Sequence, residues 1–164
     1  MIEYIKNKCR MYQTKFSFGT TSAIITNLSL IVGLDTMAHP KLGIIGGILI
    51  IALADNISDS LGIHVYQESE CITRREVWIS TFTNFLARFL VSLTFILLVT
   101  ILPINWAVTC AIIWGLTLLG ILSYSIARAE EVNPYVAMFE HIAIAVIVIA
   151  LSHIAGRWAI IHFR

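Results

Sequence analysis

Five long apolar runs dominate the sequence and constrain what it can fold into. They lie at about 16–37, 43–66, 77–102, 106–127 and 136–161. A helix needs about 20 residues to cross a hydrocarbon core of about 30 Å. The runs are too long for the strands of a membrane barrel and lack their period of two. We therefore predict an all-α, polytopic membrane protein with five transmembrane helices in a single domain, residues 1–164.

The composition favours the same class of protein. Of the 164 residues, 58% are hydrophobic and 13% are charged, whereas about a quarter of a soluble domain is charged. Pro40, Pro103 and Pro134 all lie at predicted span boundaries, where a missing N–H group costs least. The lipid bilayer is thus the first predicted partner. We predict no nucleic-acid partner, and the net charge of +1 gives no indication of one.

Positive charges predict the orientation. The first apolar run is too long for a signal-peptide core and lacks a small-x-small cleavage site, so we interpret it as a retained span. One side of a five-span bundle then carries Lys6, Lys8, Arg10, Lys15, Arg74, Arg75 and Arg128, and the other carries Lys41, Arg157 and Arg164. The positive-inside rule places the N-terminus in the cytoplasm and the C-terminus outside. We expect a prokaryotic cytoplasmic membrane.

The second predicted span contains two carboxylates at membrane depth. At about 100° per residue, Asp55, Asp59, Gly62 and Tyr66 fall on one helix face, and Ile48 extends that face. An aspartate near the middle of a span costs about 2.5–3.5 kcal/mol on insertion scales. The pair must therefore be protonated, paired with a base or bound to a metal ion.

The first predicted span carries a stripe of small and hydroxyl-bearing residues. Its members are Gly19, Ser22, Thr26, Ser29 and Gly33. Such a stripe lets two helix backbones approach closely, and its hydroxyl groups can bind what the aspartates hold. We predict that it faces the aspartates. Thr20 and Asn27 form a second polar line on another face.

Arg88, near the middle of the third span, offers an alternative explanation for the aspartates. It could form an ion pair with Asp55 or Asp59. Two carboxylates against one guanidinium still leave a place for a proton or a cation at neutral pH. Excess acid inside a membrane indicates a functional site.

Two stretches resemble the vacuolar iron transporter family, which includes the yeast calcium-sensitivity cross-complementer type. Residues 19–34, GTTSAIITNLSLIVGL, resemble its first-span pattern, and residues 56–70, NISDSLGIHVYQESE, resemble its second-span segment. The residues that match the second pattern in place are Ile57, Ser58, Leu61, Gly62, Ser69 and Glu70. The resemblance implies a homodimer that exports ferrous iron or manganese from the cytoplasm, commonly in exchange for protons. The metal is then a substrate, and no tightly bound cofactor is expected.

Three metal-contacting positions of the family differ here. Ser22 stands where the family has aspartate, Asp59 where it has methionine, and Ile51 where it has glutamate. The cytoplasmic metal-binding domain of many members is also absent. Without the thioether the predicted ligands are all oxygens, which suit manganese, magnesium, calcium or ferrous iron rather than copper. The predicted metal ligands are Asp55, Asp59, Ser22, Thr26 and Asn56.

Other acidic and imidazole groups have two interpretations each. Glu68 and Glu70 could attract cations to a cytoplasmic entrance, or simply form a solvated helix end. Glu140 and His141 open the fifth span and could contact a metal ion, although the helix dipole alone favours an acid there. His64 projects nearly opposite Asp55, so the two cannot bind one ion from an unbroken helix.

Two hypotheses follow from the sequence. The first is a proton-coupled divalent-cation exporter that uses the aspartates, and the second is a membrane scaffold or accessory subunit in which the aspartates form a structural ion pair. Cys9, Cys71 and Cys110 lack the spacing of a disulfide framework or a zinc site. No nucleophile elbow, phosphate loop or dinucleotide fingerprint occurs. We therefore predict no catalytic residues and no enzyme.

Overall fold

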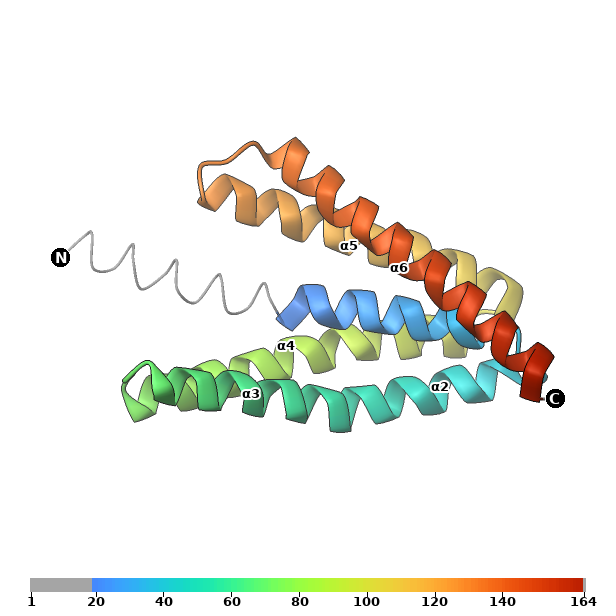
Figure 1. Ribbon diagram of the computed structural model, residues 1–164, viewed down its shortest axis with the longest axis horizontal. Coiled ribbons are helices and arrows are strands. Elements are labelled where there is room, and N and C mark those ends of the chain that lie inside the picture. Colours follow the sequence, from blue (N-terminus) through green and yellow to red (C-terminus); the bar gives the residue numbers. More distant parts are fainter. Residues whose placement is uncertain (1–18, 164) are drawn as a thin grey trace.

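The computed structural model describes residues 19–163, and this part of the chain consists of helices joined by short turns (Figure 1). The helices are Gly19–Leu34, α2 (Pro40–Ile50), η1 (Ile51–Asp55, a π-helical turn), α3 (Asn56–Ser69), α4 (Arg74–Ile101), α5 (Ile104–Ala129) and α6 (Pro134–Phe163). No strand occurs within these residues. The prediction of an all-helical fold is therefore confirmed for residues 19–163.

Four helical stretches are long and apolar enough to cross a membrane. They are Pro40–Ser69, Arg74–Ile101, Ile104–Ala129 and Pro134–Phe163, each of 26 to 30 residues. Helix Gly19–Leu34 is apolar but shorter, and residues 16–18 of the predicted first span lie outside the described range. These four stretches indicate an integral membrane protein.

The prolines mark the helix starts as predicted. Pro40 and Pro134 are the first residues of α2 and α6, and Pro103 immediately precedes α5. Proline suits these positions because its fixed φ is helical and its missing N–H would have no partner in the first turn. At the far end of α4, the Lys41 ammonium donates to the carbonyl oxygens of Thr100 and Leu102, which extends the hydrogen bonding beyond the helix.

The helices pack as two hairpins with Gly19–Leu34 between them (Figure 1). One hairpin pairs α2, η1 and α3 with α4, and the other pairs α5 with α6. The central apolar cluster draws on every helix except η1 and α3: Ile24, Leu28, Ile31, Ile44, Ile48, Phe95, Val99, Ala107, Ala111, Leu119 and Ala145. The short first helix thus holds the two hairpins together.

Helix α6 touches Gly19–Leu34 through two glycines. A Cβ built on Gly156 would overlap the carbonyl group of Gly33. A Cβ built on Gly33 would lie 3.4 Å from the carbonyl oxygen of Ser152. Small residues are typical where membrane helices approach this closely. The Gly33 end of the predicted small-residue stripe therefore faces α6, and not the aspartate-bearing helix as we had predicted.

The π-helical turn changes which residues share a face of the second span. The N–H of Asn56 bonds to the carbonyl oxygen of Ile51, five residues back, and this wider turn shifts the helical phase. Ile48 is fully buried in the core, whereas Asp55 and Asp59 are half-buried and Gly62 is exposed. The prediction that Ile48 extends the aspartate face is wrong, because it assumed an unbroken α-helix.

Candidate functional site

The guanidinium of Arg88 is the centre of a buried polar cluster. Its Nη2 lies 2.8 Å from Oδ2 of Asp55 and its Nη1 lies 2.7 Å from Oδ2 of Asp59. Its Nε donates to Oδ1 of Asn56 at 2.9 Å, and Nη1 also donates to the carbonyl oxygen of Gly19 at 3.4 Å. Arg88 is fully buried. The cluster therefore ties α4 to η1, to α3 and to the first helix.

The two aspartates are placed differently from the arginine they hold. The side chains of Asp55 and Asp59 are 42% and 38% exposed, whereas that of Arg88 is 0% exposed. Both bonds from Arg88 go to the Oδ2 atoms. The carboxylates can thus be approached from outside the bundle while the guanidinium cannot. With both acids ionised, the three side chains carry one excess negative charge.

The cluster belongs to a longer line of buried polar contacts, which we call the polar seam. On α4 its members recur every four residues, at Ser80, Asn84, Arg88 and Ser92. Gln67 donates to Ser80 at 2.8 Å, Asn84 donates to Ser60 at 3.0 Å, and Asn27 donates to Ser92 at 3.0 Å. The seam therefore joins α4 to α3 along one part of its length and to the first helix farther along.

Three amide oxygens of the polar seam have no partner. Oε1 of Gln67 and the Oδ1 atoms of Asn84 and Asn27 are buried, and no described group donates a hydrogen bond to them. A buried acceptor without a donor costs about 1–3 kcal/mol. Such atoms in a seam that otherwise pairs its polar groups indicate places where another donor or a cation can bind.

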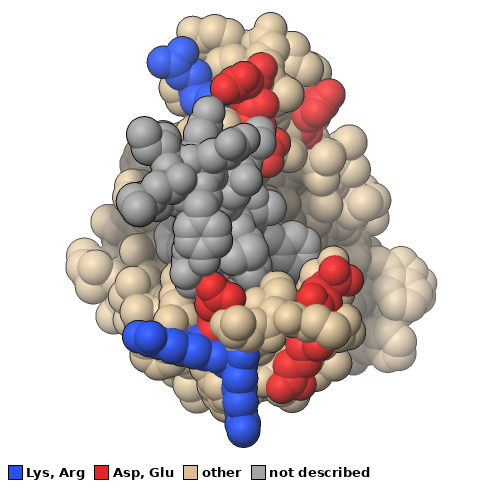
Figure 2. Space-filling view, turned by 90° about the vertical axis from the view of Figure 1, so that its left-hand side faces the viewer, with Lys and Arg blue, Asp and Glu red and all other residues tan. Residues whose placement is uncertain are grey.

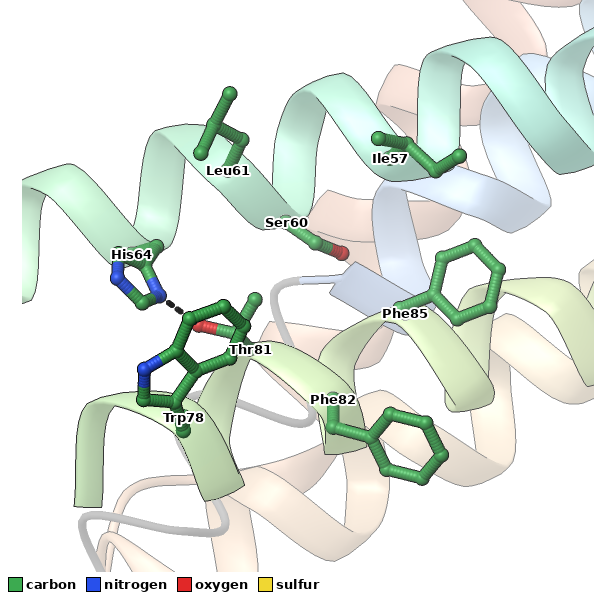
Figure 3. A pocket seen from close by; sticks show the side chains of 8 residues that line it. All are labelled: Ile57, Ser60, Leu61, His64, Trp78, Thr81, Phe82 and Phe85. Carbon is green, nitrogen blue, oxygen red and sulfur yellow. Dashed lines mark hydrogen bonds between the residues drawn. The ribbon is translucent and has the colours of Figure 1, made fainter. Parts of the chain in front are cut away.

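His64 and Glu68 lie on the seam near its turn end. Nε2 of His64 is 3.3 Å from Oε1 of Glu68, its Nδ1 is 2.9 Å from Oγ1 of Thr81, and its ring contacts Trp78 edge to face. His64, Thr81 and Trp78 border a cavity of about 300 Å³ between α3 and α4, whose other walls are mostly aliphatic and aromatic (Figure 3). Glu68 and Glu70 are exposed, as expected for an entrance or a solvated helix end.

Charged side chains gather at the end of the molecule that carries the α3–α4 and α5–α6 turns (Figure 2). Arg74 and Arg75 are exposed at the first turn, beside Glu70. Arg128, Glu130 and Glu131 are exposed at the second. Acidic and basic groups are mixed there, so a mobile cation at this end meets carboxylates of both turns.

The structure brings together some predicted site residues and leaves others apart. Asp55, Asn56 and Asp59 meet around Arg88, so the ion-pair partner foreseen from the sequence is in place. Ser22 and Thr26 are partly buried, and no hydrogen bond joins them to these carboxylates within residues 19–163. It is Asn27, from the second polar line, that faces α4.

Glu140 and His141 lie on the other hairpin. Glu140 is exposed on α6, and Nδ1 of His141 is 2.8 Å from Oγ of Ser123 on α5. Neither contacts the Arg88 cluster. Among the described residues no three His, Cys, Asp or Glu side chains converge as they would to hold a metal ion. Any cation at Asp55 and Asp59 must therefore share these two carboxylates with Arg88 or with amide and hydroxyl oxygens.

Apart from Arg88, the polar positions of α4 were missed by the sequence reasoning, although a signal was present. The third span reads STFTNFLARFLVSL from residue 80, and its Ser, Asn, Arg and Ser recur with a spacing of four. That spacing places them on one helix face. Ser60, His64 and Gln67 follow one another on α3 at spacings of four and three, which also places them on one helix face. Comparisons of the chain with protein-family models, curated proteins and solved structures found no match.

Proposed function

We propose that this protein transports a divalent cation, ferrous iron or manganese, out of the cytoplasm in exchange for protons. The observation that carries the proposal is the excess acid at Arg88, where two carboxylates face one guanidinium. An uncompensated negative charge within an apolar span is unfavourable unless a mobile positive species neutralises it. A cation and a proton can alternate in that role.

The exposure of the carboxylates supports access by an ion. Both aspartate side chains are about two-fifths exposed, and only their Oδ2 atoms contact Arg88. Carboxylate and amide oxygens suit hard cations such as manganese, with Asn56 as a neighbouring amide. The acids therefore keep a face that neither Arg88 nor the rest of the bundle covers, and we propose that the ion binds there.

The resemblance of residues 19–34 and 56–70 to vacuolar iron transporters supports the same substrate class. On that basis we propose a homodimer in a prokaryotic cytoplasmic membrane, with five spans and the N-terminus inside. The charged turns at 70–73 and 130–133 lie at one end of the molecule, which is the arrangement that this orientation needs (Figure 1).

Flux into vesicles tests the proposal. The protein is reconstituted into lipid vesicles that contain a Mn²⁺-sensitive dye, and the initial rate of quenching is measured under an imposed pH gradient. We expect the double variant Asp55→Asn, Asp59→Asn to fall to the rate of empty vesicles. The matched control is Glu130→Gln, Glu131→Gln, which removes the same charge from an exposed turn and should keep the native rate. Native flux in the aspartate variant refutes the proposal.

A second candidate, a scaffold or accessory subunit, is favoured by a different observation. Arg88 bonds to both aspartates, to Asn56 and to Gly19, as a structural crosslink would. A buried, hydrogen-bonded ion pair can fix the register of packed helices. A scaffold should show no shift of its melting temperature in detergent when Mn²⁺ or Fe²⁺ is added, whereas a transporter is stabilised by its substrate.

A further inference from the structure

Arg88 lies where a transported cation has to bind, and a free acceptor lies one helical turn away from it. Asn84 precedes Arg88 by four residues on α4, and its Oδ1 is buried without a partner. We propose that Arg88 is a resident cation which the transported ion displaces, and that Oδ1 of Asn84 accepts the guanidinium when it leaves the aspartates. This inference rests on the proposed function, because it describes how the same site exchanges its cation.

Gly19 shows that the two groups share one space. A Cβ placed on Gly19 would overlap Oδ1 of Asn84 and would lie 3.4 Å from Cδ of Arg88. Oδ1 of Asn84 fills the position that a side-chain carbon at residue 19 would take, and the stem of Arg88 lies beside it. The two side chains are therefore close neighbours, and a rotation of the Arg88 side chain is the movement that the exchange needs.

The hydrogen bonding of Asn84 leaves its oxygen free for this role. Its Nδ2 donates to Oγ of Ser60 at 3.0 Å, and Oδ1 is the unpaired end of the amide. Arg88 is permanently charged and fully buried, so it needs an acceptor wherever it lies. A buried neutral amide oxygen provides one that does not compete for the incoming cation.

The exchange has two arrangements. In the structure the aspartates hold Arg88 and the Asn84 oxygen is unpaired. In the second arrangement the cation holds the aspartates and the guanidinium donates to Asn84. Two packings that differ by a small free energy are what a substrate-driven exchange requires, because the substrate only has to favour one of them.

Binding of Mn²⁺ to the full-length protein in detergent, measured by titration calorimetry, tests the exchange. Arg88→Gln should bind Mn²⁺ at least about tenfold more tightly, because the resident competitor is gone. Asn84→Leu should bind it more weakly, since the displaced guanidinium has no acceptor. In the double variant the effect of Asn84→Leu should vanish, because Asn84 acts only through Arg88. If the role of Asn84 were only structural, Asn84→Leu would change the Mn²⁺ affinity by the same factor in the native protein and in Arg88→Gln.

Gln67→Leu is the matched control. Like Asn84, Gln67 donates to a serine across the contact between α3 and α4 and has a buried unpaired oxygen, but it lies eight residues beyond Asp59. It should lose comparable thermal stability and leave Mn²⁺ affinity unchanged. If Asn84→Leu does not fold, Asn84→Val removes the same oxygen with a smaller side chain.

The outcomes separate this inference from the proposed function. A native protein that neither binds nor moves Mn²⁺ or Fe²⁺ overturns both. The exchange alone is overturned if the native protein transports Mn²⁺ but Arg88→Gln binds Mn²⁺ more weakly than the native protein does. It is also overturned if Asn84→Leu and Gln67→Leu bind Mn²⁺ with equal affinity. Tighter binding by Arg88→Gln, with an Asn84 effect confined to the native arginine, supports it.

Discussion

At the scale of single residues, the charge of Arg88 decides both the stability and the chemistry of the cluster. The guanidinium contacts two carboxylates, an amide oxygen and a backbone carbonyl. Removing one partner of a buried ion pair leaves an uncompensated charge, which costs about 3–5 kcal/mol. The aspartates here are partly exposed, so solvent lowers that cost.

Arg88→Met should therefore destabilise the protein by about 3 kcal/mol, at the lower end of that range. Adding Asp55→Asn and Asp59→Asn to the same chain should recover much of the loss, because the triple variant leaves no unpaired charge. Unfolding in mixed detergent micelles measures both values. A triple variant less stable than Arg88→Met would show that the aspartates stabilise the fold through contacts other than Arg88.

At the scale of helices, the π-helical turn η1 sets where the aspartates point. A π-helical turn holds one residue more than an α-helical one, so deleting a residue from it can restore a continuous α-helix with both flanks in register. Leu53 is exposed within η1, and Leu61 is exposed within α3. Deletions at these two leucines remove the same side chain and differ only in the turn that they shorten.

We expect deletion of Leu53 to be tolerated, with little change in melting temperature. Deletion of Leu61 should rotate the rest of α3 by about 100° and break the bonds of His64 to Thr81 and of Gln67 to Ser80, at about 1 kcal/mol for each bond. Thermal unfolding in detergent compares the two. Equal melting temperatures for the two deletions would contradict the interpretation that η1 holds one extra residue in an otherwise α-helical span.

The contact between α6 and the first helix makes a second prediction at this scale. Gly156→Ala places a methyl group on the backbone of Gly33, which cannot move aside as a flexible side chain can. We expect a loss of about 1–3 kcal/mol, typical of an overpacked contact. Gly62→Ala, where no heavy atom lies within 4 Å of the added carbon, should be neutral or stabilising by about 0.5–1 kcal/mol. Comparable losses in both variants would contradict this packing.

The parts of the fold that depend on local chemistry could be predicted from the sequence. Apolar length and the three prolines predicted helix boundaries close to those observed. An ion pair of Arg88 with Asp55 or Asp59 was one of two interpretations of the sequence, and the structure pairs Arg88 with both. Which face of the first helix packs against α4 could not be predicted in the same way. Asn27 and Ser22 lie on different faces of that helix, and only the packing of both hairpins selects Asn27. No residue type marks the π-helical turn either, because it arises from how the two flanking segments pack.

At the scale of the whole molecule, the distribution of turns and charges predicts which ends face the cytoplasm. The turn at 70–73 and the turn at 130–133 lie at one end, and the turn at 35–39 lies at the other (Figure 1). Arg74, Arg75 and Arg128 belong to the first end and Lys41 to the second. The positive-inside rule then places Cys71, which is exposed, in the cytoplasm.

Cysteine labelling in intact cells checks this topology. In a chain with Cys9 and Cys110 replaced by serine, a membrane-impermeant maleimide should label Cys71 only after the membrane is opened. A cysteine placed at His39, which is exposed in the turn at the other end, should be labelled from outside in the absence of Cys71. The reverse pattern would invert the orientation and with it the direction of transport.

An experimental structure with Mn²⁺ bound, read through the anomalous scattering of the metal, tests the central claim most directly. We expect one anomalous peak within bonding distance of Asp55 and Asp59, with the Arg88 guanidinium turned away from both carboxylates toward Asn84. A structure at saturating Mn²⁺ that shows no peak there, and Arg88 still bonded to both aspartates, would contradict it.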